Sequence, residues 1–321
     1  MINYIIKRIA HAAIVLAVVS VVIFCLTTYI GDPVNMMVSE KASAGTRELV
    51  RQQLGLNEPL PVQYWIFLKN VMNGQFGHSY TYKIPVIGLI LERLPATLEM
   101  VAVSIVLAVV IAIPLGVFAG AFPKRGISRI IMASSLFGAS LPTFFVGMML
   151  ILIFAVNLGW LPSSGRGPSS VVMGVRLSIN DPAGIRYMIL PALTLAFANL
   201  AMLIRLTRAG MMEVMRHDFI RFARAKGVSE RDVMFKHALK NALIPVVTVF
   251  GMEIGSLIAF TTVTETIFAW PGLGKLLMDS IYASDRPVIV VYLLLTAVLF
   301  VVLNFIVDML YTIIDPRIDL R

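Results

Sequence analysis

Long apolar runs are the feature that most constrains this chain. An α-helix rises about 1.5 Å per residue, so roughly 20 apolar residues cross the ~30 Å hydrocarbon core of a bilayer. Backbone polar groups in hydrocarbon must bond to one another, which a helix achieves alone. The sequence therefore predicts an all-α polytopic membrane protein with six transmembrane helices, at about residues 9–30, 100–122, 130–156, 187–204, 241–264 and 287–314.

Composition supports this class and excludes others. The chain is 58% hydrophobic and 14% charged, whereas soluble domains are about a quarter charged. Its single cysteine, Cys25, excludes a disulfide framework. The first apolar run is longer than the core of a signal peptide, so we expect an uncleaved helix.

The distribution of positive charge predicts the orientation. Sixteen of the 27 Lys and Arg residues lie in the N-terminal tail, a turn at 123–129, a loop at 205–240 and the C-terminal tail. Cytoplasmic segments carry such an excess, so we expect these four segments and both termini to be cytoplasmic. The net charge of +9 is then an orientation signal, and no nucleic-acid partner is expected.

The same topology predicts the domain organisation. Residues 1–30 form an N-terminal tail and the first span, and residues 31–94 form an extracytoplasmic segment. Within that segment, residues 62–72 are expected to form a short helix, either a platform for a partner or a cap over the bundle. Residues 95–314 form a five-helix core with the cytoplasmic loop 205–240, and residues 315–321 form a tail.

The most basic segment contains the stretch DFIRFARAKG, from Asp218 to Gly227. Met215, Phe219 and Phe222 are spaced at i, i+4 and i+7, so they would share one face of a helix. Ala223 and Gly227, four residues apart, would place a strip of small residues beside that face. This pattern predicts a helix that binds to another protein surface. The alternative is a solvated loop whose charge only sets the orientation of the chain in the membrane.

Catalytic motifs are missing from the sequence. It contains no phosphate-binding loop, no metal-ligand spacing and no nucleophile motif, so we expect no catalytic site, bound metal or bound cofactor. We therefore expect that the energy for transport comes from another chain, which contacts this one at the cytoplasmic face. A stand-alone channel or ion-driven carrier remains the alternative, although only Glu253 and Asp308 are acidic residues well inside the predicted spans.

FARAKG at 222–227, followed by HALKNALIPVVT at 237–248, resembles the cytoplasmic signature loop of binding-protein-dependent ABC transporter permeases. The chain is most similar to the dipeptide/oligopeptide/nickel branch, and within it to the B-type permease subunit of dipeptide importers. One departure is that Arg221-Phe222-Ala223 stands where the broad family pattern has Glu-Ala-Ala. Further matching motifs are GDP at 31–33, LGL at 54–56, LPATLE at 94–99, LPSSGR at 161–166, TETIFAWPGLG at 264–274 and DPR at 315–317.

The resemblance implies a type I ABC importer permease architecture in a bacterial or archaeal cytoplasmic membrane. It implies as partners a second permease in a heterodimer, two ATPase subunits that bind ATP and Mg, and an extracytoplasmic solute-binding protein. The implied substrates are dipeptides and oligopeptides, with nickel chelates, glutathione and oligosaccharides as alternatives. The residues that would couple to the ATPase are Phe219, Arg221, Phe222, Ala223, Arg224, Ala225, Lys226 and Gly227.

Two places are candidates for the translocation pathway. Glu253 would bind the amino group of a peptide or hydrogen-bond a neighbouring helix, because a carboxylate in hydrocarbon must face protein or water. The segment 265–274 would dip back toward the pathway as an outer gate, or it would form a plain surface hairpin. Its candidate residues are Glu265, Trp270, Pro271, Gly272 and Gly274.

Overall fold

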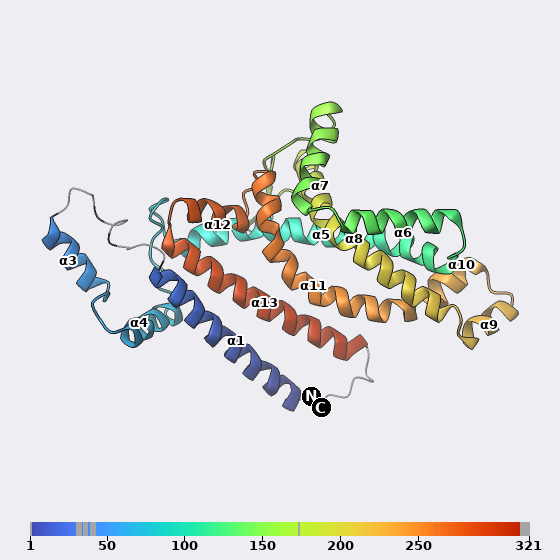
Figure 1. Ribbon diagram of the computed structural model, residues 1–321, viewed down its shortest axis with the longest axis horizontal. Coiled ribbons are helices and arrows are strands. Elements are labelled where there is room, and N and C mark those ends of the chain that lie inside the picture. The colour runs from blue at the N-terminus through green and yellow to red at the C-terminus, as the bar shows by residue number, and fades with distance from the viewer. Residues whose placement is uncertain (1, 30–33, 35–37, 39–42, 173, 315–321) are drawn as a thin grey trace. The chain divides into compact units, whose positions relative to one another are not determined.

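The structure is a computed structural model that describes residues 2–29, 34, 38, 43–172 and 174–314 (Figure 1). Most of these residues are helical. A single two-stranded sheet pairs β1 (Ser170–Val172) with β2 (Val175–Leu177) in antiparallel register among them. The chain divides into two compact units, which are described separately: unit 1 covers residues up to Leu94 and Lys275–Val302, and unit 2 covers Pro95–Gly274 and residues from Leu303 onward.

Unit 1 contains the N-terminal helices and parts of three helices shared with unit 2. Its own helices are α1 (Ile2–Tyr29), α3 (Ala44–Gln53) and α4 (Leu60–Met72). The shared helices are α5 (Val86–Ala121), α12 (Leu273–Tyr282) and α13 (Arg286–Ile314).

Unit 2 contains the remaining elements. Its helices, where η marks a π-helix, are α6 (Gly126–Ala139), α7 (Thr143–Leu150), η1 (Ile151–Asn157), α8 (Pro182–Val214), α9 (Asp218–Ala225), α10 (Glu230–Asp232), η2 (Val233–Ala238) and α11 (Leu239–Ile267).

The predicted helical membrane fold is confirmed. In the described chain, five helical stretches are long and apolar enough to cross a membrane, and they lie in α1, α5, α8, the run from α10 into α11, and α13. The pair formed by α6 and α7–η1 makes a sixth if the bent pair is counted as one span. Helix α4 also confirms the predicted short helix at 62–72.

The third predicted span is not one helix. The structure bends by 108° between α6 and α7–η1, so the predicted span over 130–156, which contains Pro142, is broken into two helices. Pro142 is the cause, because it lacks an N–H and forces the residue before it out of the α region. It adopts an extended conformation (φ −60°, ψ 138°) immediately before α7 begins.

The predicted cytoplasmic loop 205–240 is also largely helical. Helix α8 begins early because the Asp181 carboxylate accepts hydrogen bonds from the N–H groups of Ala183 (2.8 Å) and Gly184 (3.4 Å). It continues beyond the apolar run to Val214, and the Arg205 Nε donates to the Ala201 carbonyl at 3.2 Å. The basic residues therefore stand on helices that project from the predicted spans.

Helix α8 is the centre of unit 2, and α6, α7 and α11 pack against it. Gly116 and Gly120 of α5 lie so close to Thr207 and Met211 of α8 that a Cβ on either glycine would overlap the neighbouring helix. This spacing is the small-xxx-small pattern that lets membrane helices approach closely. The close approach holds α5 against α8. Candidate site residues lie in the N-terminal half of α5 and in α9, which follows α8.

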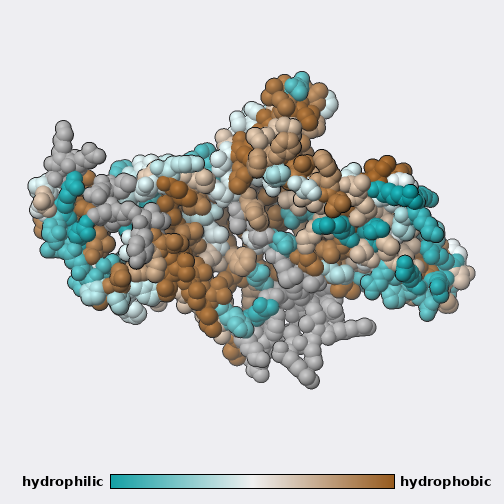
Figure 2. Space-filling view, viewed as in Figure 1, coloured by the Kyte–Doolittle hydropathy of each residue, from teal (hydrophilic) through white to brown (hydrophobic). Residues whose placement is uncertain are grey.

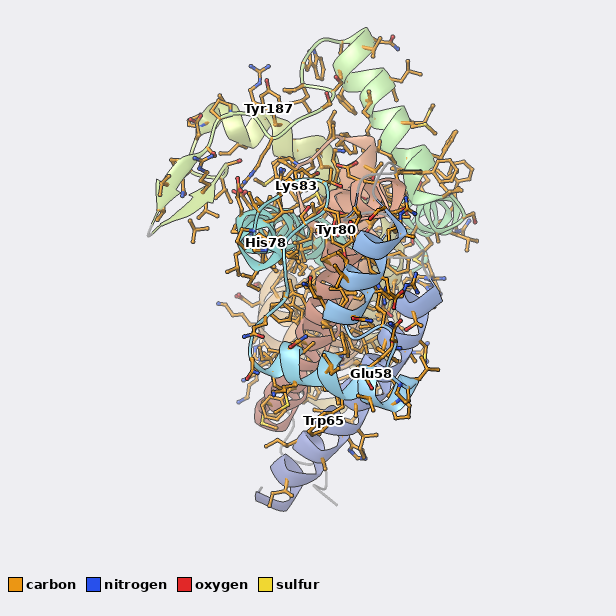
Figure 3. The ribbon with its side chains drawn as sticks, turned by 90° about the vertical axis from the view of Figure 1, so that its left-hand side faces the viewer. Glu58, Trp65, His78, Tyr80, Lys83 and Tyr187 are labelled. Atoms are coloured by element: carbon orange, nitrogen blue, oxygen red, sulfur yellow. The ribbon has the colours of Figure 1, made fainter. Side chains whose placement is uncertain are left out.

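Unit 1 is held by a smaller set of contacts. The rings of Phe24 on α1 and of Tyr64 and Phe67 on α4 lie 5.4–6.3 Å apart. Ahead of α13, the buried Asp285 carboxylate accepts hydrogen bonds from the Ser79 hydroxyl and the backbone N–H of Tyr80. Figure 3 shows Tyr80 on the loop before α5 and Trp65 on α4.

Candidate functional site

Helix α9 is built as a short separate helix after α8. The chain leaves the helical conformation at His217 (φ −67°, ψ 149°), and α9 begins at Asp218, whose negative charge suits the N-terminal end of a helix dipole. The helix ends in a Schellman motif, in which the Gly227 N–H donates to Arg224 (2.9 Å) and the Val228 N–H donates to Ala223 (3.2 Å). Gly227 has φ +79°, a conformation that favours glycine.

One face of α9 is packed against its own chain. Ile220 is fully buried and Ala223 is 7% exposed. They form a cluster with Met211 of α8, Val233 of η2 and Ala242 of α11. The expectation of an exposed small-residue strip is therefore wrong for Ala223, whose side chain is used to dock α9 onto unit 2.

The adjacent face of α9 carries exposed aromatic residues. Phe219 is 43% exposed and Phe222 is 62% exposed. The His217 ring stacks on Phe219 at 5.8 Å, and the Lys226 ammonium lies 4.6 Å from the centre of the Phe222 ring. Met215 does not join them, because α8 ends at Val214 and Met215 packs into the cluster.

The charged residues around this face lie in solvent. Arg224 makes a two-pronged ion pair with Glu230, at 2.7 and 3.2 Å. Arg221 contacts Asp218 at 3.4 Å, and both side chains are largely exposed, so this pair contributes little to stability. In Figure 2, hydrophilic residues gather around α9 and α10. Large aromatic rings within a polar rim are typical of a protein-binding surface.

The segment 265–274 has the opposite character, and the surface-hairpin interpretation is wrong. Glu265, Trp270, Gly272 and Gly274 are buried, while Pro271 is half-buried. The Trp270 Nε1 donates to the Ala96 carbonyl at 2.9 Å. A Cβ at Gly272 would overlap the Glu265 carboxylate, so the turn between α11 and α12 is closed tightly around that side chain.

Thr97 joins both sides of this turn. Its hydroxyl donates to Glu265 Oε1 at 2.6 Å and accepts the Leu273 N–H at 2.8 Å. The backbone between them is constrained as well, since Ala269 adopts φ +46°, a conformation that is rare for residues other than glycine. The constrained backbone and the buried hydrogen bonds to Ala96 and Thr97 therefore hold the segment against α5.

A second buried carboxylate, that of Glu99, lies on α5 two residues after Thr97. Glu99 of α5 accepts a hydrogen bond from Arg166 at 2.8 Å and from the N–H groups of Ser178 and Ile179 at 2.6 and 2.7 Å. The Arg166 guanidinium also lies 5.8 Å from the centre of the Trp270 ring. Sequence analysis assigned Thr97, Glu99 and Arg166 no role, although the motifs LPATLE and LPSSGR contain them.

The predicted pathway residues do not form one cluster. Glu253 is half-buried in the middle of α11, and at a rise of about 1.5 Å per residue it stands about 18 Å along the helix from Glu265. The described residues contain no group of three or more His, Cys, Asp or Glu side chains that could hold a metal ion. The geometry thus defines an exposed helical surface, a buried polar turn and a separate acidic residue within α11.

Apolar helices that are long enough to cross a membrane define the chain as a polytopic membrane protein. Residues 112–320 match the family described as "Binding-protein-dependent transport system inner membrane component", and residues 1–101 match the model for the N-terminal part of such membrane components. The chain belongs to this family.

Similar proteins span the whole chain. The oligopeptide transport system permease protein AppB of Bacillus subtilis (strain 168) is 43% identical over 318 residues, which cover 98% of this chain and 99% of AppB. The glutathione transport system permease protein GsiC of Escherichia coli (strain K12) is 40% identical over 319 residues, 99% of both chains. These likenesses confirm the resemblance to the peptide branch of ABC importer permeases.

Solved structures show the same fold. Two crystal forms of the inward-facing MetNI methionine ABC transporter match with TM-scores of 0.55 and 0.58 at 20% and 19% identity, covering 72% of this chain and 98% of the matched chain. The type I permease architecture is therefore confirmed. The chain is a multi-pass inner-membrane permease subunit of a binding-protein-dependent ABC importer, and ATP hydrolysis in such systems is performed by separate subunits. The alternative of a stand-alone carrier is excluded.

Proposed function

We propose that this chain forms half of the translocation pathway of a peptide importer and that α9 couples it to an ATPase subunit. The observation that carries this proposal is the division of α9 into two faces. Ile220 and Ala223 attach it to the core, while Phe219 and Phe222 present exposed rings. A groove in the ATPase would bury these rings, as aromatic anchors do in stable interfaces.

The attachment of α9 makes it suitable as a rigid lever. Its buried face contacts residues of α5, α8, η2 and α11, so a displacement of α9 is transmitted to several helices at once. Arg221, Arg224 and Lys226 would meet acidic residues at the rim of the groove, and the exposed small residues Ala225 and Gly227 would allow close approach. ATP-driven closure of the ATPase pair would then switch the pathway between its two openings.

The coupling proposal is tested by co-purification of the permease with its ATPase subunits. Phe222→Asp places a charge in the proposed groove, and we expect the ATPases to be lost while the permease still inserts in the membrane. Tyr282→Asp, at an 81% exposed aromatic residue of α12, is the matched control and should retain them. Equal retention by both variants would overturn the coupling role of α9.

Short peptides are the proposed substrate class. The supporting observation is that AppB is named for oligopeptides and GsiC for glutathione, and both substrates are peptides. The test is ATP-dependent uptake into proteoliposomes that contain the full complex and its solute-binding protein. Labelled tripeptide should accumulate and labelled trisaccharide should not; uptake of the sugar or of a nickel chelate alone would replace the peptide assignment.

The pathway proposal assigns separate roles to Glu253 and the segment 265–274. We propose that Glu253 binds the peptide amino group, because the amino group is cationic and acidic residues within membrane spans mark substrate pathways. Glu265, Trp270, Pro271, Gly272 and Gly274 would form the outer gate, which their burial and polar contacts support. Unchanged peptide uptake by Glu253→Gln would remove the ligand role of that residue.

The proposed assembly has a second permease chain in a heterodimer, two ATPase subunits that bind ATP and Mg, and an extracytoplasmic solute-binding protein. Both termini would be cytoplasmic, which the concentration of Lys and Arg in the segments expected inside supports. Protease added to right-side-out vesicles should leave an N-terminal tag intact. Cleavage of the tag in sealed vesicles would reverse the orientation.

A further inference from the structure

An apolar groove lies between α1, α4 and α13 within unit 1. Its volume is about 390 Å³, and Ala17 of α1, Leu68 of α4 and Leu295 of α13 contribute to its wall. The exposed wall is entirely apolar. The Ser20 hydroxyl at its edge is already bonded to the Ala17 carbonyl (2.7 Å) and to the Tyr64 hydroxyl (2.8 Å). A peptide or another polar ligand would lose its hydrogen bonds to water there without compensation.

The groove lies at the depth of the hydrocarbon core. Ala17 falls in the middle of the apolar stretch Arg8–Leu26, and Leu295 falls inside the apolar stretch Arg286–Val307. Helix α1 exposes large apolar side chains along its length, including Val15, Val18 and Val22. Figure 2 shows hydrophobic residues over α1 and α13. A groove that opens on such a surface would accept an apolar chain.

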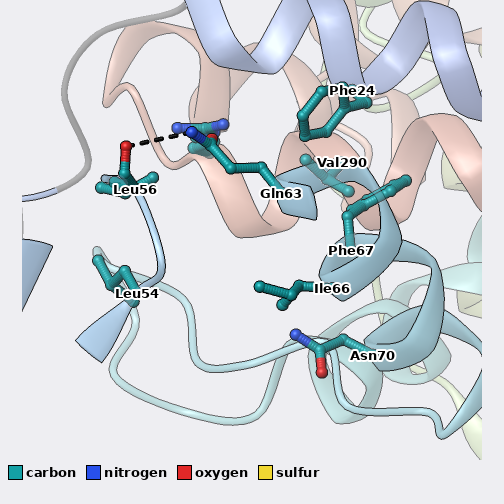
Figure 4. Close-up of a pocket in the computed structure, with 9 residues that line it drawn as sticks. Phe24, Leu54, Leu56, Gln63, Ile66, Phe67, Asn70 and Val290 are labelled. Atoms are coloured by element: carbon teal, nitrogen blue, oxygen red, sulfur yellow. Dashed lines mark hydrogen bonds between the residues drawn. The ribbon is translucent and has the colours of Figure 1, made fainter. Parts of the chain in front are cut away.

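A second pocket adjoins the groove at the start of α13, where Val290 lines the pocket and Val291 lines the groove. Its volume is about 260 Å³ and its wall is largely apolar, but Asn70 of α4 and Arg286, the first residue of α13, add polar groups to it. Phe24, one helical turn beyond Ser20 on α1, lines this pocket (Figure 4). A cation at the end of an apolar helix stands at the level of the lipid phosphates.

The combined length of the two pockets is close to the depth of one leaflet. Arg286 lines the second pocket and Val298 lines the far end of the groove, about 18 Å away along α13 at about 1.5 Å per residue. One leaflet of the hydrocarbon core is about 15 Å deep, half of the ~30 Å total. A headgroup at Arg286 therefore allows an acyl chain to extend along the groove to the middle of the membrane.

We propose that unit 1 binds one phospholipid, with its phosphate on Arg286 and Asn70 and one acyl chain in the groove between α1 and α13. Bulk lipid is as apolar as the groove, so the chain alone gains only packing contacts. The charge-assisted contact at Arg286 selects and retains the molecule. This proposal depends on the membrane location of unit 1 and not on the substrate or on the coupling role of α9.

The test counts phospholipids by native mass spectrometry of the importer complex, reconstituted in nanodiscs of phosphatidylethanolamine and phosphatidylglycerol and released into mild detergent. Ala17→Phe fills the groove and should remove one phospholipid per chain. Val18→Phe, on the adjacent lipid-facing position that is 57% exposed, should retain it. Arg286→Gln should lower the occupied fraction about tenfold, because it removes a hydrogen bond to a charged group, and Arg286→Lys should largely keep it.

Equal phospholipid counts in the wild type and Ala17→Phe would overturn the proposal. A second pair protects the result against misfolding of one variant: Ala297→Phe lies in the groove, and Val302→Phe, at a 46% exposed position of α13, is its control. A helix of another chain would be a different occupant. In a Cys25→Ser background, a cysteine at Leu295 that cross-links to the second permease would establish that occupant and exclude the lipid.

Discussion

The two candidate functional segments, α9 and residues 265–274, use the same kinds of residues in opposite ways. In α9, Phe219 and Phe222 are exposed and the nearby ion pairs lie in solvent. In the segment 265–274, Trp270 and Glu265 are completely buried and their polar atoms bond to α5. Aromatic and charged residues thus form an exposed surface in α9. In residues 265–274 they form a buried contact with α5, which we call the internal joint.

This difference teaches how each segment should respond to mutation. Aromatic rings that are still exposed have burial energy available for a second protein. Rings and carboxylates that are already buried have used it within their own chain, and their removal leaves cavities and unpaired polar groups. Changes in residues 265–274 should therefore reduce stability, whereas changes on the exposed face of α9 should reduce binding.

Trp270→Ala should have the largest effect on stability. We expect a loss of about 4–5 kcal/mol, since a large buried ring is removed and the Ala96 carbonyl loses its donor. The measurement is the thermal unfolding midpoint of the purified permease. Trp65→Ala, at a 67% exposed tryptophan of α4, is the control and should change little. Equal shifts for the two variants would contradict the internal-joint interpretation.

Arg166→Met should have the next largest effect. Glu99 would keep its bonds to Ser178 and Ile179 but lose its ion-pair partner Arg166. The side chains of this pair are nearly buried, with exposed fractions of 2% for Glu99 and 12% for Arg166. Removing one member of a buried pair costs about 3 kcal/mol or more. The double variant Glu99→Gln/Arg166→Met should recover part of this loss in the same unfolding assay. A double variant as unstable as the sum of both single changes would argue against coupling between the two residues.

Gly227→Ala should cost about 1 kcal/mol, because φ +79° disfavours a residue with a Cβ. Steric overlap does not add to this cost, since a Cβ at this position meets nothing within 4 Å. Gly227→Asn should be milder, as asparagine tolerates the left-handed conformation at a helix C-terminus. Hydrogen exchange of the α9 amides would measure both, and faster exchange in the asparagine variant than in the alanine variant would refute this explanation.

The parts of this molecule that follow from local sequence could be predicted. Apolar length alone located the spans, and the spacing within Asp218–Gly227 identified a helix with exposed aromatic residues. The extension of α8 to Val214 was missed because the apolar run that marked the predicted span stops at Arg205. The helical backbone hydrogen bonds continue past that residue. Helix α3 was missed too, although Ser43, whose hydroxyl caps the Thr46 N–H at 3.2 Å, was a readable start signal.

The parts that depend on distant contacts could not be predicted. Glu99 meets Arg166 across 67 positions, and Thr97 meets Glu265 across 168. Nothing in the local pattern distinguishes these buried groups from exposed ones, because burial of a charge depends on a partner that only the fold supplies. The break at Pro142 lies between these cases: the proline was visible, but the bend of 108° depends on how the two helices pack.

Phe222→Ala should have the smallest effect on stability and gives the sharpest test of the comparison. The ring is 62% exposed and its contact with Lys226 is a solvent-exposed cation–π pair. The free energy of unfolding should therefore change by no more than about 0.5 kcal/mol. Ile220→Ala, on the buried face of the same helix, should cost about 2–4 kcal/mol because it opens a cavity in the cluster beneath α9. If Phe222→Ala destabilises the isolated permease as much as Ile220→Ala does, the ring belongs to the chain's own packing. A stable Phe222→Ala permease that nevertheless fails to retain ATPase subunits would mean that this face of α9 is reserved for another protein.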